Sequence, residues 1–235
     1  TALVSLIYVN NEIGSITDIP SISEICRKQG IAFHSDLTQA IGKIRICVHE
    51  MGIDYASCSA HKIYGPKGIG AAYMRSDDYG IQPITAFMHG GEQEFGFRAG
   101  TLAVHNIVGF GKAAEIALRD FQKNEKELKR LDTRFIEAVS DIPNIRLTIV
   151  PEKRAPGIIS IIVEKKDFNN ERFIKAVSDD LALSTGSACS AGEPSYVISA
   201  IGLEDEVSKV LRISLNKYTT DDDIKKLIQI LQSRV

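Results

Sequence analysis

Short apolar runs of strand length alternate with a helical apolar period at the start of the chain. Residues 3–9 and 31–35 are apolar and end in polar loops, while the segment from Pro20 to Gly30 repeats apolar side chains on one helical face. Proline suits the first turn of a helix and glycine its end. Strand, helix and strand joined by short loops predict a βαβ unit, and therefore an α/β fold built on a parallel sheet.

The next strand-like run, residues 54–58, ends in a cluster of reactive side chains. Ser59, His61 and Lys62 follow it, and a turn rich in glycine and proline leads to another apolar run at 69–74. A lone lysine there is usually surface charge, but a desolvated lysine amine can condense with a carbonyl group. Ser59 and His61 could both face one phosphate while Lys62 reaches an aldehyde of the same molecule. This combination suits pyridoxal phosphate (PLP).

Three polar residues follow predicted strands at the same end. Asn11, Asp36 and Lys62 each come soon after an apolar run. Ligands of parallel sheets bind beyond the carboxyl ends of the strands, so we expect these three residues to converge on one site. For Asp36 the position alone favours a plainer role, which is capping the next turn.

A long helix is predicted from residue 102 to about residue 139. Its first half repeats apolar residues at helical spacing, and packing into the core is a sufficient explanation for that stripe. The stripe consists of Ile107, Phe110, Ala114 and Leu118. Residues 119–126 are polar and predict a solvated linking helix. We therefore expect a large PLP-binding domain over residues 1–125 and a small domain over 126–235, with the final helix packing on either of them.

The second half of the chain predicts an α+β unit. Apolar runs of strand length alternate with helical periods, and no internal repeat appears. We expect strands at 145–150, 157–163, 182–184 and 210–215, a helix from Asn169 and a final helix at 220–233.

Composition and charge narrow the range of partners. The 235 residues are 44% hydrophobic and 25% charged, which is typical of a soluble globular protein. A net charge of −2 with mixed signs gives no basic surface for nucleic acid or an acidic membrane. No apolar run is long enough to cross a bilayer and the chain does not open like a signal peptide, so we expect a cytoplasmic protein.

The four cysteines lack the close pairs of a zinc site and the pattern of a disulfide framework, which suits a reducing cytosol. Cys26, Cys47 and Cys58 are expected to lie in apolar strands or helices as small buried residues. Cys189 differs, because residues 184–195 are small, polar and glycine-bearing. An exposed thiol on a mobile loop is what a nucleophile needs when it must visit a substrate and carry the product elsewhere.

These motifs together resemble one enzyme family. Residues 34–40 (HSDLTQA), 59–62 (SAHK) and 187–189 (SAC) are similar to those of the cysteine desulfurases of the NifS/IscS type, which are PLP enzymes of the class V aminotransferase group. The resemblance runs from Val4 to the C-terminal helix and implies the fold of PLP-dependent transferases of the aspartate aminotransferase type. Members of the family carry a further N-terminal third, so we expect this chain to be a fragment, a cleaved product or a part of a longer protein.

The resemblance implies a role for each residue around the cofactor. Lys62 would bind PLP and move the proton of the substrate Cα. Asp36 would hold the pyridine nitrogen and keep it protonated, and Gln39 would donate to the phenolic oxygen. Ser59 and His61 would hold the phosphate.

Two residues are implied to bind the substrate. Arg212 matches the arginine that grips the substrate carboxylate, a task for which the planar guanidinium is well shaped. Without that match, half of a structural ion pair is the favoured reading of an arginine in a strand. Asn11 resembles the residue that helps to hold the substrate and a cofactor oxygen.

The glycine-rich segment at residues 89–101 is by itself an ordinary connection. It resembles the family loop whose threonine reaches the phosphate in the other subunit. The resemblance therefore implies that Thr101 completes the site of a partner in a homodimer. Glu92 stands where glycine is usual in this loop, and Phe95 stands where arginine is usual.

The resemblance also implies a reaction. L-cysteine would become L-alanine, leaving on Cys189 a persulfide that a sulfur-acceptor protein takes for iron–sulfur cluster assembly, tRNA thiolation or DNA phosphorothioation. Direct binding of nucleic acid, a membrane or a metal ion is not expected. The alternatives are another class V PLP enzyme, such as a selenocysteine lyase or an aminotransferase, and an inactive fragment that acts as an interaction module.

Overall fold

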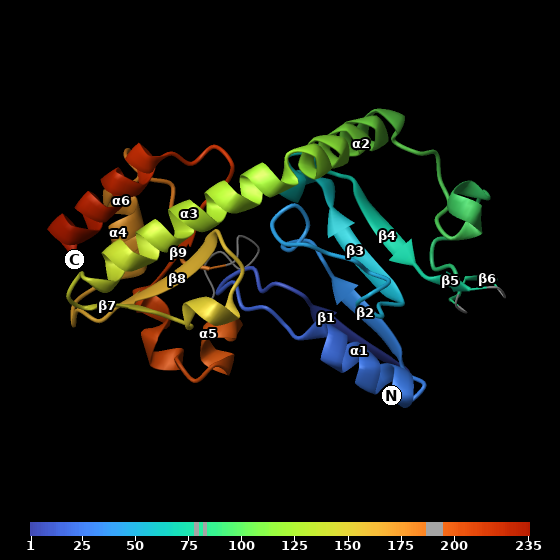
Figure 1. Ribbon diagram of the computed structural model, residues 1–235, viewed down its shortest axis with the longest axis horizontal. Helices are drawn as coiled ribbons and strands as arrows, with labels where there is room; N and C mark the ends of the chain where they lie inside the picture. The colour runs from blue at the N-terminus through green and yellow to red at the C-terminus, as the bar shows by residue number, and fades with distance from the viewer. Residues whose placement is uncertain (78–79, 82–83, 187–194) are drawn as a thin grey trace. The chain divides into compact units, whose positions relative to one another are not determined.

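The computed structural model describes residues 1–77, 80–81, 84–186 and 195–235 (Figure 1). The chain divides into two compact units. The first contains residues 1–8 and 17–121, and the second contains residues 9–16 and 122–235. The second unit is therefore discontinuous in sequence, because it takes a short early segment as well as the C-terminal half.

The first unit is built on a four-stranded sheet of order β1-β2-β3-β4. The strands are β1 (Leu3–Ile7), β2 (Ala32–Asp36), β3 (Tyr55–Ser59) and β4 (Gly70–Met74). β1, β2 and β3 are parallel, as the βαβ pattern predicts, while β4 runs antiparallel to β3. The chain can turn back after β3 because the link from β3 to β4 is short, and only antiparallel neighbours can be joined so directly.

One helix covers a face of this sheet. In α1 (Ile19–Lys28), Pro20 lies in the first turn, and Asp18 caps the helix by accepting a hydrogen bond from the backbone of Ser21. α1 and the sheet enclose a core that contains Ile19, Cys26, Phe33, Met51, Ile53 and Ala56. A further pair of short strands, β5 (Ser76–Asp77) and β6 (Gly80–Ile81), forms an antiparallel ladder.

The predicted long helix is two helices, α2 (Val104–Arg119) and α3 (Phe121–Ser140), separated at Asp120. The prediction that the stripe of α2 packs into the core is wrong for most of its members. The side chain of Leu118 is 81% exposed, and Ile107 and Ala114 are exposed too.

A different face of α2 makes the contacts. Its small residues are spaced by four positions, at Gly109, Ala113 and Ala117, and Ala113 is the buried residue of the helix. An added Cβ on Gly109 would lie 3.0 Å from Pro66, and one on Gly65 would lie 3.1 Å from Ala113. Small side chains let the helix backbone approach the turn after β3, so close approach and not bulk hydrophobicity selects the buried face.

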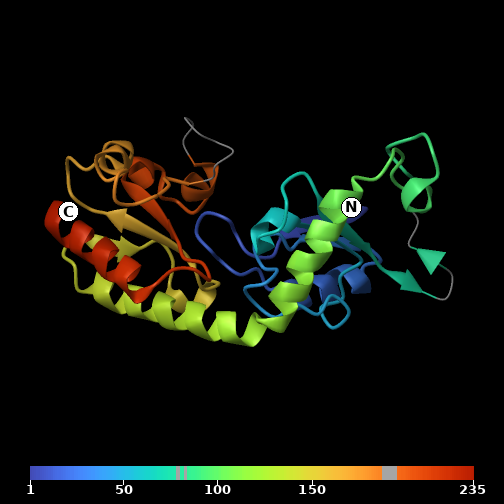
Figure 2. The same cartoon turned by 90° about the horizontal axis from the view of Figure 1, so that it is seen from above.

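The second unit is a three-stranded antiparallel sheet of order β7-β8-β9 with helices packed on it. Its strands are β7 (Ile145–Leu147), β8 (Ile158–Val163) and β9 (Val210–Ser214), and its other helices are α4 (Asn170–Ala176), α5 (Tyr196–Ala200) and α6 (Asp221–Arg234). The predicted strand at 182–184 is reduced to a single bridge between Ser184 and Arg212. In Figures 1 and 2, α3 and α6 lie side by side over the sheet.

The core of the second unit lies between these helices and the sheet. Every residue of β8 is buried, as expected of a central strand. α3 contributes Leu131 and Phe135 to the core, and α6 contributes Ile224 and Leu231. α6 begins with a capping box, in which the side chains of Thr220 and Asp223 each accept a hydrogen bond from the backbone of the other.

A buried ion pair ties α3 to the connection before β8. Arg154 and Asp132 form a two-point pair, with the guanidinium Nη1 3.0 Å from the carboxylate Oδ1. Asp132 also accepts a hydrogen bond of 2.7 Å from the backbone of Gly157, and Arg154 donates to the carbonyls of Ala155 and Ile158. The pair thereby fixes the path of the chain into the central strand.

Candidate functional site

Two of the predicted site residues follow neighbouring parallel strands. Asp36 is the last residue of β2. Lys62 lies in a short 3₁₀ helix, η1 (Ala60–Ile63), that follows β3 directly. Since Asp36 and Ser57 are in register between β2 and β3, the carboxyl group and the amine both belong to the carboxyl-terminal edge of this sheet. The shared edge holds for Asp36 and Lys62, whereas Asn11, the third residue expected there, belongs to the second unit.

The turn that carries Lys62 is shaped by its backbone. Tyr64 has a positive φ of 68°, and the amide of Gly65 donates to the carbonyl of Ala60 at 2.9 Å, which closes the turn. His61 and Lys62 are exposed, and neither forms a hydrogen bond or ion pair with any residue that the structure describes. The amine of Lys62 is therefore available for a ligand.

Asp36 caps the turn that follows it, as its position alone predicts. Its Oδ1 accepts a hydrogen bond of 2.8 Å from the backbone of Thr38, so it does cap the following turn. Its second oxygen remains available for a ligand. Gln39 is buried, and its Oε1 accepts a hydrogen bond of 3.0 Å from the amine of Lys43. That contact orients the side chain and leaves the amide nitrogen of Gln39 as a donor.

Sequence reasoning gave no role to His34, which lies two residues before Asp36 on the same face of β2. Its Nδ1 is 2.8 Å from the hydroxyl of Ser5 on β1. Burial lowers the pKa of His34, and the nearby Asp36 opposes that effect only in part. His34 therefore tends to stay neutral beside the carboxyl group of Asp36.

The remaining polar residues of interest lie in the second unit. Asn11 is in the segment 9–16, and Arg212 is in β9. The Nη1 of Arg212 donates to the carbonyl of Asn11 at 3.1 Å. The structure thus brings the two predicted substrate-binding residues together.

The electrostatic setting of Arg212 suits an anionic ligand. Burial lowers the pKa of its guanidinium, and Glu12 acts in the opposite direction. Its Nε is buried without a hydrogen-bond partner among the described residues. Within that part of the chain Arg212 makes no ion pair, so the structural ion pair that sequence position alone favours is not found there.

The structure also reveals a buried charged residue that the sequence did not single out. Glu12 is 3% exposed, although it stands in a polar loop that looked solvated. Its carboxyl group accepts a hydrogen bond from Ser195. A polar loop gives no periodicity from which burial can be inferred, so no signal in the sequence could have found it.

The predicted nucleophile, Cys189, lies in residues 187–194, outside the described part of the chain. Among the described cysteines, Cys26 is buried, while Cys47 and Cys58 are partly buried. Cys47 lies in a loop, so the prediction that it belongs to a strand or helix is wrong. Burial raises the pKa of the Cys58 thiol, which opposes thiolate formation.

Thr101 is exposed at the end of a compact connection that precedes α2. The side chain of Gln93 accepts a hydrogen bond of 3.0 Å from the backbone of Gly100, and Arg98 donates to the carbonyls of Ala99 and Gly100. The connection is thus held by its own side chains. The role of Thr101 in a second subunit stays a prediction.

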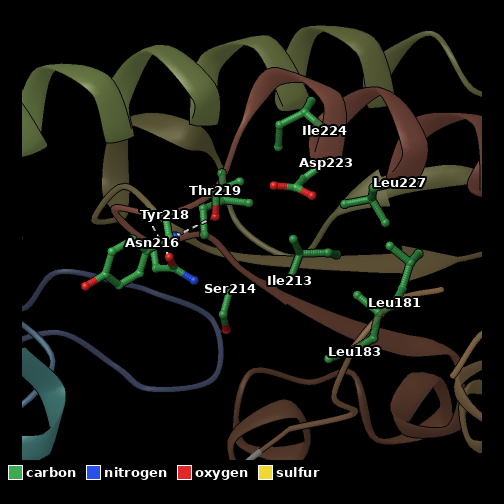
Figure 3. A pocket seen from close by; sticks show the side chains of 12 residues that line it. Leu181, Leu183, Ile213, Ser214, Asn216, Tyr218, Thr219, Asp223, Ile224 and Leu227 are labelled. Atoms are coloured by element: carbon green, nitrogen blue, oxygen red, sulfur yellow. Dashed lines mark hydrogen bonds between the residues drawn. The ribbon is translucent and has the colours of Figure 1, made fainter. Parts of the chain in front are cut away.

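A cavity of about 250 Å³ lies in the second unit (Figure 3). Its walls come from β9, the start of α6 and residues 181–183. Leu183, Ile213 and Leu227 give it apolar walls, and Asn216 and Asp223 supply polar groups. It contains none of the residues predicted to bind PLP or substrate.

No group of three or more His, Cys, Asp or Glu side chains is arranged to hold a metal ion within the ranges that the structure covers. In the same ranges no helix is both long and apolar enough to span a bilayer.

The donor set of the first unit fits PLP. It offers an amine at Lys62 that is unpaired among the described residues, a carboxyl oxygen at Asp36 and an amide donor at Gln39, all at the carboxyl ends of two parallel strands. Ser59 and His61 flank the amine and can donate to a phosphate. Each functional group of PLP thus has a chemically matched side chain.

Comparison with known proteins agrees with this assignment. A family model described as "Aminotransferase class-V" matches residues 1–227. A cysteine desulfurase IscS of Pectobacterium carotovorum is 42% identical over 238 residues, which is 100% of this chain and 58% of that relative. The chain thus spans a little over half the length of the curated relatives that it matches.

Solved structures give the same picture. A NifS-like protein from Rickettsia africae has a TM-score of 0.86 and 31% identity, covering 98% of this chain and 61% of that one. DndA from Streptomyces lividans has a TM-score of 0.76 and 29% identity, covering 92% of this chain and 61% of that one. The predicted fold class and the resemblance to NifS/IscS-type cysteine desulfurases are confirmed.

Proposed function

The chain belongs to the aminotransferase class-V family, and on that premise we propose that it acts as a PLP-dependent cysteine desulfurase. The observation that carries the proposal is that Asp36 and Lys62 lie at the same edge of the sheet, while the Lys62 amine has no partner among the described residues. PLP chemistry requires a carboxylate that keeps the pyridine nitrogen protonated and an amine that binds the aldehyde.

The proposed reaction transfers one sulfur atom. The thiol of Cys189 and L-cysteine give a persulfide on Cys189 and L-alanine. One S–S bond forms and the Cβ–S bond of the substrate breaks, with its electron pair remaining on carbon. A proton replaces the sulfur on that carbon, so atoms and electrons balance without an added oxidant or reductant.

The residues of the first unit would hold the cofactor and move protons. PLP, when bound, draws electrons from the substrate Cα. Lys62 would bind its aldehyde and then take and return protons at the substrate. Asp36 would hold the pyridine nitrogen, Gln39 would donate to the phenolic oxygen, and Ser59 with His61 would bind the phosphate.

The residues of the second unit would bind the substrate. The Arg212 guanidinium would grip the carboxylate of L-cysteine, and the contact of its Nη1 with the carbonyl of Asn11 would fix its orientation. Asn11 would help to hold the substrate and a cofactor oxygen. This division of labour follows the division of the chain into two units.

We also propose the setting in which the reaction occurs. Thr101 would complete the phosphate site of a second subunit, so the working form would be a homodimer. The nucleophile must be a free thiol, and the cytoplasm keeps thiols reduced, which favours that compartment. A sulfur-acceptor protein would then take the sulfur for iron–sulfur cluster assembly or nucleic-acid thiolation.

The proposal is tested by the visible absorption of PLP and by the products. The purified chain incubated with PLP should gain a visible band, and L-cysteine should then yield alanine and a mass increase of one sulfur on Cys189. Lys62→Ala should remove the band, whereas Cys189→Ala should keep the band and abolish alanine formation. Lys67→Ala, an exposed lysine in the same turn, is the matched control and should change neither.

The outcomes separate the candidate functions. Alanine formation that survives in the Cys189→Ala chain would point to a different class V activity. A chain that stays colourless with PLP, or whose band persists in the Lys62→Ala variant, would overturn the proposal.

A further inference from the structure

The loop that contains Glu12 is held by its own hydrogen bonds and by close packing on β8. The side-chain oxygen of Asn10 accepts hydrogen bonds from the backbones of Glu12 and Ile13, at 2.8 and 3.0 Å. Gly14 has a φ of 75°, and a Cβ added there would lie 2.6 Å from the carbonyl oxygen of Ile158. The loop therefore sits directly on the central strand of the second unit and holds the Glu12 side chain in one place.

The carboxyl group of Glu12 binds the residue at which the described chain resumes. The hydroxyl of Ser195 donates to Glu12 Oε2 at 2.5 Å, and both residues are buried, with exposed fractions of 7% and 3%. The same hydroxyl accepts from the backbone of Ile198 and so caps α5. Ser195 is thus fixed from both sides.

The same carboxyl oxygen lies close to Gly186, the last described residue before segment 187–194. A Cβ added to Gly186 would lie 3.0 Å from Glu12 Oε2, so the glycine backbone packs against that oxygen. Gly186 is itself held by Ser184, whose hydroxyl donates to its carbonyl at 2.8 Å. Ser184 in turn exchanges backbone hydrogen bonds with Arg212, at 2.7 and 3.4 Å.

One oxygen atom therefore binds Ser195 and lies against Gly186, the two residues that flank segment 187–194. These contacts join sequence positions far apart, since Glu12 and Ser195 are separated by 183 residues. They also connect to the substrate-binding residues, because the neighbour of Glu12, Asn11, accepts the hydrogen bond of Arg212.

We propose that Glu12 is a positioning residue that fixes both ends of segment 187–194, and so sets the place from which Cys189 reaches the substrate sulfur. The inference rests on the proposed desulfurase function. Glu12 touches neither substrate nor cofactor in this scheme. It acts through Gly186 and Ser195, and a misplacement of about 1 Å at a reacting group can cost about a hundredfold in rate.

The test removes the acceptor oxygen and follows Cys189 in two independent ways. The first measurement is the spectrum of a nitroxide attached to Cys189, with a Cys189→Ser chain as background, and it needs no PLP. The second is the rate of persulfide formation on Cys189 in a single turnover, together with the change in the PLP band on adding L-cysteine, which reports substrate binding.

Glu12→Ala should narrow the nitroxide lines and slow persulfide formation about tenfold or more. The concentration of L-cysteine that half-saturates the change in the PLP band should stay within about twofold. Glu12→Gln keeps an oxygen that can accept from Ser195 and should restore most of the rate. Ser195→Ala removes the donor and should act in the same direction, which keeps the test decisive if Glu12→Ala does not fold. Glu137→Gln, an exposed glutamate on α3, is the control and should change nothing.

The results distinguish the two levels of proposal. If the unsubstituted chain forms persulfide and the folded Glu12→Ala and Ser195→Ala chains match it in both rate and spectrum, the role of Glu12 is refuted. A loss of thermal stability without either change also refutes it. If no chain forms persulfide, the desulfurase proposal fails, while the nitroxide spectra still decide whether Glu12 fixes the segment.

Discussion

Replacing Asp132 by alanine should destabilise the second unit more than any surface substitution. Its partner in the pair, Arg154, is almost fully buried, with side-chain exposures of 2% for the arginine and 9% for the aspartate. The substitution leaves the guanidinium with the carbonyls of Ala155 and Ile158 and no counter-charge. Removing one partner of a buried pair costs about 3–5 kcal/mol, because the remaining charge stays desolvated.

A loss of this size is large relative to the free energy of unfolding of a whole domain. Domains of this kind unfold with about 5–15 kcal/mol, so the variant would lose a substantial part of its stability. Asp132→Asn keeps the shape and one acceptor for the amide of Gly157, and should cost less than Asp132→Ala. Replacing both members by apolar residues, Asp132→Leu with Arg154→Met, should recover much of the loss, since no buried charge then remains.

Urea unfolding followed by circular dichroism measures the free energy of unfolding, and hydrogen exchange of the β8 amides reports the second unit alone. Glu115→Ala, which breaks an exposed pair with Lys112, is the control and should leave both unchanged. A loss below about 1 kcal/mol for Asp132→Ala, or a double variant less stable than either single one, would refute the reasoning from burial.

Three further predictions concern single positions. Gly14→Ala should destabilise the second unit and slow alanine formation, because φ is 75° and its Cβ would meet Ile158 at 2.6 Å; thermal unfolding and product assays check this. Thr220→Ala should lower the free energy of unfolding by about 1 kcal/mol, since the capping box of α6 with Asp223 is lost; a urea curve with an unshifted midpoint would contradict it. Burial depresses the folded pKa of His34 below its unfolded value of 6.5. The contribution of His34 to stability is therefore present above that pH and is lost as the pH falls towards the folded pKa. The free energy of unfolding, measured between pH 7.5 and pH 5, should fall less steeply in a His34→Gln chain.

The sequence predicted the site best where reactive side chains come directly after predicted strands. Asp36 and Lys62 could be assigned to one sheet edge because parallel strands share the direction of their carboxyl ends. The cap that Asp36 places on the following turn was likewise predictable, because that rule acts over two residues.

Rules that act over a few residues could not predict packing between segments far apart in the sequence. The exposed stripe on α2 illustrates this, since Leu118 looked like a core residue while the contacts are made through Ala113. Helical periodicity reports an apolar face, but here the partner turn contains Gly65 and Pro66 and accepts only small side chains. The burial of Glu12 was hidden for the same reason, because its partner is distant in the sequence.

The early segment 9–16 has a consequence for how the chain is made. During synthesis it leaves the ribosome long before the strands and helices on which it packs, so its docking must wait until almost the whole chain is available. Contacts that span such sequence separations form slowly, because a large loop must close first. The second unit should therefore be the last part to mature, and a chaperone that shields residues 9–16 in the interval would raise the yield of native protein.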